Sequence, residues 1–204
     1  MHPVRPVIVA LLVTSLWRAD ASAQSSAGRY EVAFLGGWTK TSSEGSVLTF
    51  DVSNTYQATF TWRIWQAATA GLSIEVPLLA SPALGVKTVG SSLPKEYAAL
   101  SITPGVRVSF HPERTVSFFG ALGGGYVRYS ESKLRLDNSP NPLHKDANAA
   151  AVQFGGGVNV RASQWLGLRG EVRDVYSGPR SFSVVTPGDL VHNVVGSVGI
   201  VLWF

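Results

Sequence analysis

Hydrophobic and polar residues alternate with a period of two along most of the chain after residue 24. The clearest example is the segment 99–110, in which every even-numbered position is apolar and every odd-numbered one is small or polar. Because successive side chains of a β-strand point to opposite sides, this alternation predicts strands with one apolar and one polar face. Helical spacing is scarce, so the pattern predicts an all-β protein.

Eight segments follow this rule, and each is about ten residues long or more. They are 29–39, 55–66, 71–79, 99–110, 115–129, 149–161, 165–176 and 191–204. This number and length of strands are typical of a small membrane barrel. We therefore expect an eight-stranded, antiparallel, up-and-down transmembrane β-barrel.

A few positions break the alternation. Bulky residues occur on the polar face at Leu35, Phe119, Val195, Val201 and Trp203. Charged residues occur on the apolar face at Arg128 and Asp174, near strand ends. Pro77 and Pro104 each remove a backbone donor from a strand, so we expect local bulges at both.

The connections between the eight segments alternate in length. The short ones are 67–70, 111–114 and 162–164, and the long ones are 40–54, 80–96, 130–148 and 177–189. In an up-and-down sheet, all the long connections then lie at one end. Short turns at one end and long loops at the other are the arrangement of transmembrane β-barrels.

A sheet with one apolar face can close in two ways. With the apolar face inside, it forms a soluble lipocalin-like barrel, and with that face outside, it forms a membrane barrel. The polar face is rich in Gly, Ala, Ser and Thr, which suits the narrow interior of eight strands. Aromatic residues also gather near both strand ends, as in membrane-interface girdles. We therefore favour the membrane form. The aromatic residues are Tyr30, Phe110, Phe118, Trp165 and Phe204 near the short turns, and Trp38, Tyr56, Tyr126 and Tyr176 near the long loops.

Composition agrees with this interpretation. The 204 residues are 45% hydrophobic and 15% charged, which excludes an intrinsically disordered chain. The absence of Cys excludes disulfides and thiolate metal sites. Mean hydropathy is +0.15, although no apolar run is long enough for a transmembrane helix. Apolar residues at alternate strand positions explain that value.

The first 23 residues have the features of a cleavable signal peptide. Arg5 precedes an apolar stretch, and Ala21, Ser22 and Ala23 match the small-x-small cleavage pattern before Gln24. The alternative is a short N-terminal membrane anchor. We expect residues 1–23 to be removed and residues 24–204 to form one barrel domain.

The chain resembles the small eight-stranded outer-membrane β-barrel proteins of bacteria, the group of the OmpA transmembrane domain, OmpX and OmpW. The resemblance rests on the signal peptide, the strand count, the segments 120–126 and 167–173, and the terminal Phe204. It implies an outer-membrane location in contact with lipid and lipopolysaccharide, and no further domain after Phe204. It also implies that the barrel assembly machinery reads Phe204 as part of its signal.

The polar face also carries charged residues, and we expect them to form a charge network in the lumen. They are Glu31, Arg63, Glu75, Arg107, Arg161, Arg169, Glu171 and Arg173. An unpaired buried charge is costly, so the glutamates should pair with arginines. Arginines outnumber glutamates, so some must be hydrated or near an end. The network is interpreted either as a plug that stiffens the barrel or as a narrow gated path in which Arg selects anions.

No pattern for catalysis, cofactor or metal binding emerges. His192 is the most suggestive residue, but the outer-membrane deacylases use a Ser near their His, and Val194 stands two residues after His192. An interfacial His is the simpler interpretation. Metal-ligand spacing is missing, and no basic stripe suggests nucleic acid. We expect a non-enzymatic protein with a structural or surface-interaction role, then a narrow channel or transporter for small or hydrophobic solutes, and third an acyl hydrolase. The oligomeric state stays open.

Overall fold

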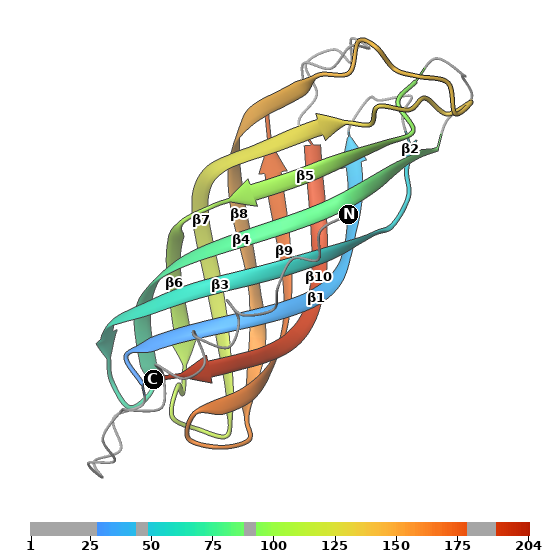
Figure 1. Ribbon diagram of the computed structural model, residues 1–204. Helices are drawn as coiled ribbons and strands as arrows, with labels where there is room; N and C mark the ends of the chain where they lie inside the picture. Colours follow the sequence, from blue (N-terminus) through green and yellow to red (C-terminus); the bar gives the residue numbers. More distant parts are fainter. Residues whose placement is uncertain (1–27, 44–48, 88–92, 179–190) are drawn as a thin grey trace, which may run out of the picture.

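The computed structural model describes residues 28–43, 49–87, 93–178 and 191–204, and the predicted signal peptide 1–23 lies outside them. Within these ranges the chain forms a closed, all-antiparallel barrel without helices (Figure 1). Eight strand positions make up the wall, because β5 and β6 together occupy one position and β2 is a two-residue addition beside β4. The strands are β1 (Tyr30–Ser43), β2 (Thr49–Phe50), β3 (Ser53–Gln66), β4 (Ala70–Lys87), β5 (Glu96–Ile102), β6 (Gly105–Phe110), β7 (Val116–Glu131), β8 (Asp146–Arg161), β9 (Leu166–Ser177) and β10 (Val191–Trp203).

Each wall strand pairs with its neighbour in the chain, and β1 pairs with β10 to close the barrel. The backbones of Tyr30 and Phe204 exchange two hydrogen bonds, of 2.9 and 3.0 Å, at the end of this seam. The predicted eight-stranded fold is therefore confirmed. The predicted loop 80–96 was too long, because β4 continues to Lys87 and β5 already begins at Glu96.

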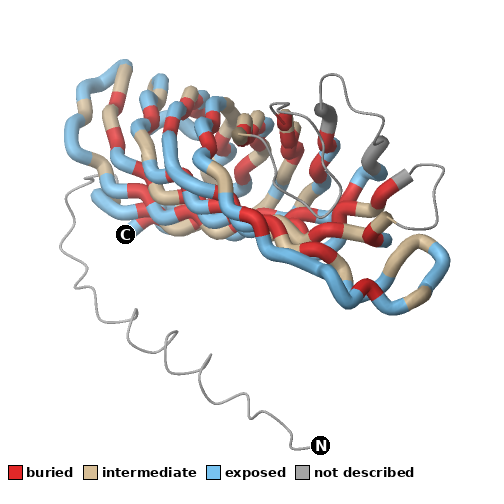
Figure 2. The backbone as a smooth tube through the Cα atoms, turned by 90° about the horizontal axis from the view of Figure 1, so that it is seen from above, coloured by how far each residue is buried: buried red, intermediate tan, exposed pale blue. Residues whose placement is uncertain are grey.

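The apolar face of the sheet points outward. Inward positions are more buried than outward ones along most of each wall strand, so that the tube is banded in Figure 2. Phe34, Phe60, Leu122 and Val198 are exposed, whereas Glu31, Glu75 and Arg107 are buried inside. This distribution excludes the lipocalin-like alternative and is that of a barrel surrounded by lipid. Among the described residues, no helix has the length and apolar character needed to span a membrane.

The bulky residues that broke the alternation point into the lumen, as their positions predict. Each is at least 95% buried, and together they fill the interior. They are Leu35, Phe119, Val195, Val201 and Trp203.

The expected bulges at Pro77 and Pro104 are absent, which corrects the sequence-based prediction. The registers of β5 and β6 against β4 and β7 continue unchanged through residues 103 and 104. Thr103 N–H still donates to the Pro77 carbonyl at 3.4 Å, and Gly124 N–H donates to the Pro104 carbonyl at 3.0 Å. Each proline therefore only deletes the reciprocal bond. The actual irregularities lie between residues 63 and 65 and between 81 and 84.

The missing bond at Pro77 predicts a stabilising substitution. In Pro77→Val, the new N–H would face the Thr103 carbonyl, which now accepts only a long 3.4 Å bond from Gln153 Nε2. We expect the free energy of unfolding to rise by about 1 kcal/mol, the typical net value of one hydrogen bond. Urea unfolding of the refolded barrel in detergent would measure the change. An unchanged or lower stability would contradict this account of the missing hydrogen bond between Pro77 and Thr103.

Candidate functional site

A continuous chain of alternating charges crosses the lumen. Six side chains from β1, β4, β6 and β9 form this ion chain, and all are nine-tenths or more buried. Their order is Arg169, Glu31, Arg107, Glu75, Arg173 and Glu171. Three positive and three negative charges make it neutral, which is the condition under which buried charges are tolerated.

Glu31 joins the first part of the ion chain. Its Oε1 accepts from Arg107 Nη1 at 2.5 Å and from Arg169 Nη2 at 2.6 Å. Its other oxygen accepts from the indole N–H of Trp203 at 3.1 Å. Both oxygens of Glu31 therefore accept hydrogen bonds, two of them from cations. These bonds stabilise the charged form of the carboxylate although it is buried.

Glu75 and Glu171 hold the second part. Glu75 accepts from Arg107 Nε and from Arg173 Nη1, both at 2.7 Å. Arg173 Nε donates to Glu171 Oε1 at 2.5 Å, and Gln57 Nε2 donates to the same oxygen at 2.5 Å. Arg107 thus binds Glu31 of β1 and Glu75 of β4, and Arg173 of β9 also binds Glu75. These bonds connect strands from different sides of the barrel.

Phe119 contacts two of the arginines with its ring. The guanidinium carbons of Arg107 and Arg169 lie 4.3 and 4.8 Å from its ring centroid. An aromatic face attracts a cation, so Phe119 stabilises two like charges that would otherwise repel each other. The ring fits because Gly157 lacks a side chain: a Cβ there would lie 2.7 Å from Phe119 Cζ.

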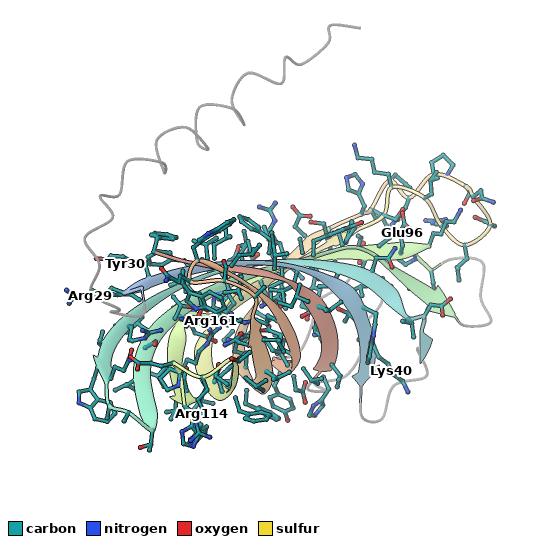
Figure 3. The ribbon with its side chains drawn as sticks, turned by 90° about the horizontal axis from the view of Figure 1, so that it is seen from below. Arg29, Tyr30, Lys40, Glu96, Arg114 and Arg161 are labelled. Atoms are coloured by element: carbon teal, nitrogen blue, oxygen red, sulfur yellow. The ribbon has the colours of Figure 1, made fainter. Side chains whose placement is uncertain are left out.

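Two of the eight predicted network residues lie apart from the ion chain. Arg63 Nη1 donates to Gln66 Oε1 at 2.5 Å, and Arg161 Nη2 donates to the Pro112 carbonyl at 3.2 Å. Arg161 also stacks over Trp203, at 4.6 Å from the ring centroid. Both lie at the short-turn end, where Figure 3 also shows Arg29 and Arg114, whereas Lys40 and Glu96 lie at the long-loop end.

Sequence reasoning missed the neutral partners of the network, Gln57, Gln153 and Asn159. All three are buried, and Asn159 Oδ1 accepts from Arg169 Nε at 2.7 Å. Their inward parity in the alternating pattern was the signal that could have identified them. Phe119 and Trp203 were recognised only as misfits, although both contact the arginines.

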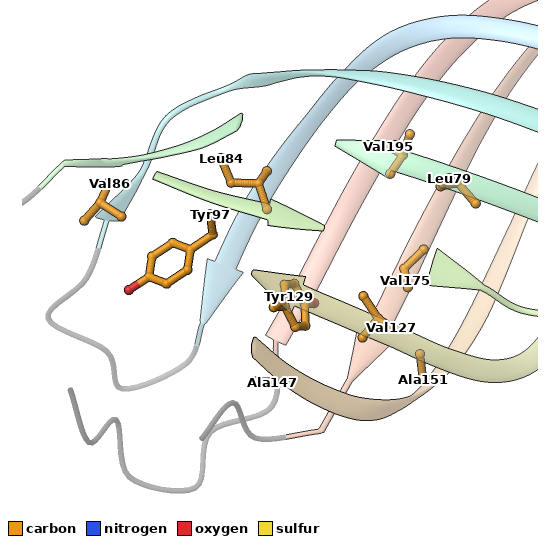
Figure 4. Close-up of a cluster of buried hydrophobic side chains, with 10 residues drawn as sticks. All are labelled: Leu79, Leu84, Val86, Tyr97, Val127, Tyr129, Ala147, Ala151, Val175 and Val195. Atoms are coloured by element: carbon orange, nitrogen blue, oxygen red, sulfur yellow. The ribbon is translucent and has the colours of Figure 1, made fainter. Parts of the chain in front are cut away.

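The long-loop half of the lumen holds a cluster of apolar side chains beside buried polar groups such as Thr55, Ser81 and Asn193, which the sequence pattern did not predict. Figure 4 shows the side chains of this upper cluster: Leu79, Leu84, Val86, Tyr97, Val127, Tyr129, Ala147, Ala151, Val175 and Val195. A cavity of about 20 Å³ lies within this cluster, lined by Leu79, Val127 and Val195 among its members and by the polar side chains of Thr39, Ser81 and Asn193. That volume holds about one water molecule. The lumen is therefore packed in two layers, one apolar and one ionic.

His192 lies on the outer face of the barrel, not in the lumen. Its Nδ1–H donates to Asp174 Oδ2 at 2.9 Å, and its ring meets the edge of Tyr176 at 4.4 Å between centroids. The outward Asp174, a misfit in the sequence pattern, is therefore partnered. Arg128, the other outward charge, pairs with Asp146 at the exposed strand ends.

The connection between β7 and β8 has a fixed shape where it is described. Isolated antiparallel β-bridges join Pro94 to Arg135 and Leu134 to Pro140. The Lys95 side chain also donates a hydrogen bond from Nζ to Asn138 Oδ1 at 3.0 Å. At its tip, the Ser139 backbone N–H and hydroxyl both donate to Asp137, at 2.9 and 2.6 Å. These bonds hold the pKa of Asp137 below its usual range, so the carboxylate stays charged.

The ion chain predicts a large loss of stability when one member is neutralised. Glu75→Gln would leave Arg107 and Arg173 without their shared carboxylate, so the free energy of unfolding should fall by about 3–5 kcal/mol. Urea titration in detergent, followed by Trp fluorescence, would measure it. Arg128→Gln is the matched control, because its exposed pair with Asp146 should contribute at most about 1 kcal/mol. Equal effects of the two variants would contradict the importance of the ion chain.

Comparison with known proteins shows similarity in structure alone. The sequence matches no protein-family model and no curated protein. The Neisserial surface protein A structure matches with a TM-score of 0.56 at 13% identity, covering 88% of this chain and 99% of that one. Ail, the attachment invasion locus protein of Yersinia pestis, matches with a TM-score of 0.52 at 12% identity, covering 86% of this chain and 99% of that one.

Identities this low establish the fold and nothing finer. The two matched proteins are both small outer-membrane barrels, and both are covered almost completely by the described topology. Together with the outward apolar face and the closed β1–β10 seam, the match identifies the chain as having the fold of the small eight-stranded outer-membrane β-barrel proteins.

Proposed function

We propose that the protein is a non-enzymatic barrel of the bacterial outer membrane that acts as a structural element and interacts through its long loops. The observation that carries this proposal is the neutral ion chain across a lumen whose wall is apolar on the outside. Ion pairs that fill the lumen stiffen the barrel wall. The loops are then the part of the protein that is available for interactions.

The packed lumen favours a plug over a gated path. Solutes would have to cross the upper cluster as well as the ion chain, and the cavity within the cluster has room for only about one water. The uninterrupted register past Pro77 and Pro104 also leaves no lateral opening at these positions. These features weigh against the channel or transporter, which remains the competing function.

The ordered loop between β7 and β8 supports a role in surface interactions. Leu134 and Leu143 are exposed on it, beside Lys133 and Lys145. Fixed backbone bridges mean that a partner would meet a preformed surface, which lowers the entropy lost on binding. We propose that the four long connections, which follow β1, β4, β7 and β9, face the cell exterior, next to lipopolysaccharide.

Phe204 has a position that suits a role in assembly. Its ring stacks on Tyr30 at 6.2 Å between centroids, and its backbone completes the β1–β10 seam. We propose that the assembly machinery recognises Phe204 before the seam closes, since a strand end with an exposed aromatic ring can be bound by another sheet edge.

We rank the acyl hydrolase third, although the register of β1 and β10 places Ser42 opposite His192. Val194 follows it on the same face, and Tyr176 packs against its ring. No acyl release from membrane lipid is expected.

A membrane barrel predicts a simple fractionation result. The expressed protein should fractionate with outer membranes and migrate differently on gels before and after boiling, because the detergent-resistant barrel unfolds only on heating. A soluble protein whose mobility is insensitive to heat would overturn the proposal.

The plug predicts electrical silence. Purified protein in a planar lipid bilayer should give no stable conductance, because the ion chain and the apolar cluster block the lumen in series. Arg107→Ala and Arg169→Ala test the alternative: reproducible single-channel steps in the wild-type protein that change in these variants would favour the anion path. Refolding of each variant is checked by the same gel shift.

A further inference from the structure

The short-turn end of the barrel carries an excess of positive charge. Among the described residues, its charged side chains belong to four arginines and one glutamate, and three of the arginines are labelled in Figure 3. The glutamate already accepts a hydrogen bond of 2.5 Å from Gln66 Nε2. Basic side chains at a membrane surface attract anionic lipid headgroups, so this excess indicates contact with an anionic leaflet. The five residues are Arg29, Arg63, Arg114, Arg161 and Glu113.

Arg114 has donor groups that the protein does not use. Its side chain is exposed, and its guanidinium has no ion pair, hydrogen bond or ring contact with any described residue. The other three arginines at this end contact an aromatic ring, a side-chain amide or a backbone carbonyl. A free guanidinium presents a planar set of N–H donors that matches the oxygens of a phosphate. Arg114 is therefore the arginine at this end that is available to an anionic headgroup.

The turn that presents Arg114 has a fixed backbone. The His111 N–H donates to the Thr69 carbonyl at 2.8 Å, and the Arg114 N–H donates to the His111 carbonyl at 3.0 Å. Pro112 between them is buried, and its carbonyl accepts from Arg161 Nη2 at 3.2 Å. His111 has a φ of 50°, in the left-handed region that residues with side chains seldom adopt. A preformed turn lowers the entropy that is lost when Arg114 binds a ligand.

Two hollows on the outer wall meet beside this turn. The first, the turn hollow, has a volume of about 610 Å³ and contains Arg114 at its edge. The second, the trough, has a volume of about 720 Å³. Phe118, an exposed outward residue of β7, lines both, so they form one continuous groove. Besides Arg114 and Phe118, the turn hollow is lined by His111, Glu113, Thr115 and Val116.

The trough rises from Phe118 across four further strands. Its residues follow a row of direct register partners, which is Phe118, Val158, Gly170, Val198 and Gly36. Phe118 is the third residue of β7 from the short-turn end, whereas Gly36 is the seventh residue of β1. The row therefore runs from the level of the short turns toward the middle of the wall. Its four strand spacings of about 4.8 Å span about 19 Å, which is long enough for most of one extended acyl chain.

We propose that this groove binds an anionic glycerophospholipid of the phosphatidylglycerol class. The phosphate pairs with the Arg114 guanidinium in the turn hollow, and one acyl chain lies in the trough. A Cβ at Gly36 or Gly170 would meet nothing within 4 Å, so these glycines leave open space for the chain. The proposal rests on the proposed orientation in the membrane, because the short-turn end then faces the leaflet opposite to lipopolysaccharide, where glycerophospholipids lie.

Two other occupants fit less well. Phosphatidylethanolamine also has a phosphate, but its amine would lie next to the like charge of Arg114 in an end of the barrel that is already cationic. A second copy of the chain would have to bring an acid to Arg114. The acidic side chain described at this end, Glu113, already accepts from Gln66, and the outward side chains on the wall strands at this level are apolar.

The test is selective retention of lipid by the refolded full chain. The protein is inserted into nanodiscs with equal amounts of phosphatidylglycerol and phosphatidylethanolamine of identical acyl chains, and native mass spectrometry counts the lipids that stay bound. We expect about fivefold preference for phosphatidylglycerol, the effect of one basic residue at an anionic surface. Arg114→Gln should abolish the preference. Arg29→Gln is the matched control and should keep it, because Arg29 is an exposed arginine at the same end that does not line the groove.

The trough is tested separately from the turn hollow. Gly170→Leu would fill the middle of the trough and should lower retention of both lipids without changing their ratio. Gly124→Leu is the matched control, since Gly124 is also exposed, would bring its Cβ no closer than 3.9 Å to another atom, and does not line the trough.

Three outcomes would overturn the site: equal retention of both lipids by the wild type, equal loss of preference in Arg114→Gln and Arg29→Gln, or equal behaviour of Gly170→Leu and its control. Cross-linked dimers that Gly170→Leu loses would overturn it too, by assigning the trough to a second copy. Insertion into nanodiscs is followed by the heat-dependent gel shift. Failure to insert would contradict the membrane barrel itself, whereas insertion without lipid preference would contradict only the lipid site.

Discussion

Neutral pairing of buried charges is the constraint on which the rest of this barrel depends. With lipid outside the wall, the charged groups inside must find their partners in the lumen. The ion chain meets this condition with three arginines and three glutamates, helped by the neutral groups of Gln57, Asn159 and Trp203. Its members come from β1, β4, β6 and β9, and four of its five ion pairs join different strands, whereas Arg173–Glu171 lies along β9. The same bonds that satisfy the charges therefore brace the barrel and close it to solutes.

The two layers of the lumen stabilise the barrel in different ways. The ionic layer fixes specific distances between walls, whereas the upper cluster fills space mainly with aliphatic side chains, and Tyr129 within it bonds to Ser177 and Asn193. An interior that is half apolar also explains why only a small set of charges is needed to fill eight strands. Phe119 joins the polar layer in a different way, because its ring faces two guanidiniums and allows them to lie close together.

Glycines on the outer wall of the barrel leave a trough between neighbouring side chains. Where side chains are absent on β1, β8 and β9, the wall thins to backbone and a trough remains, directly below Lys40 and Asp174. In the lumen, glycine has the opposite effect, because Gly157 makes room for Phe119. The same residue type thus makes room for an aromatic ring on the lumen side of the wall and leaves an open trough on the outer side.

The sequence by itself determined the strand count, the closure into a barrel and which face points outward, because a strict period of two leaves only one face for each side chain. Even the misfits Leu35 and Val201 obeyed this parity. It could not determine which of the eight predicted charges meet, since pairing across the lumen depends on the register of strands far apart in the chain. Arg63 and Arg161 point inward like Arg107, but they lie nearer the short-turn end. There they donate to the Gln66 side chain and the Pro112 carbonyl. Nor could it show that Pro77 and Pro104 keep the register, or that Asp174 meets His192. Those outcomes depend on distances between strands, and only the tertiary structure sets them.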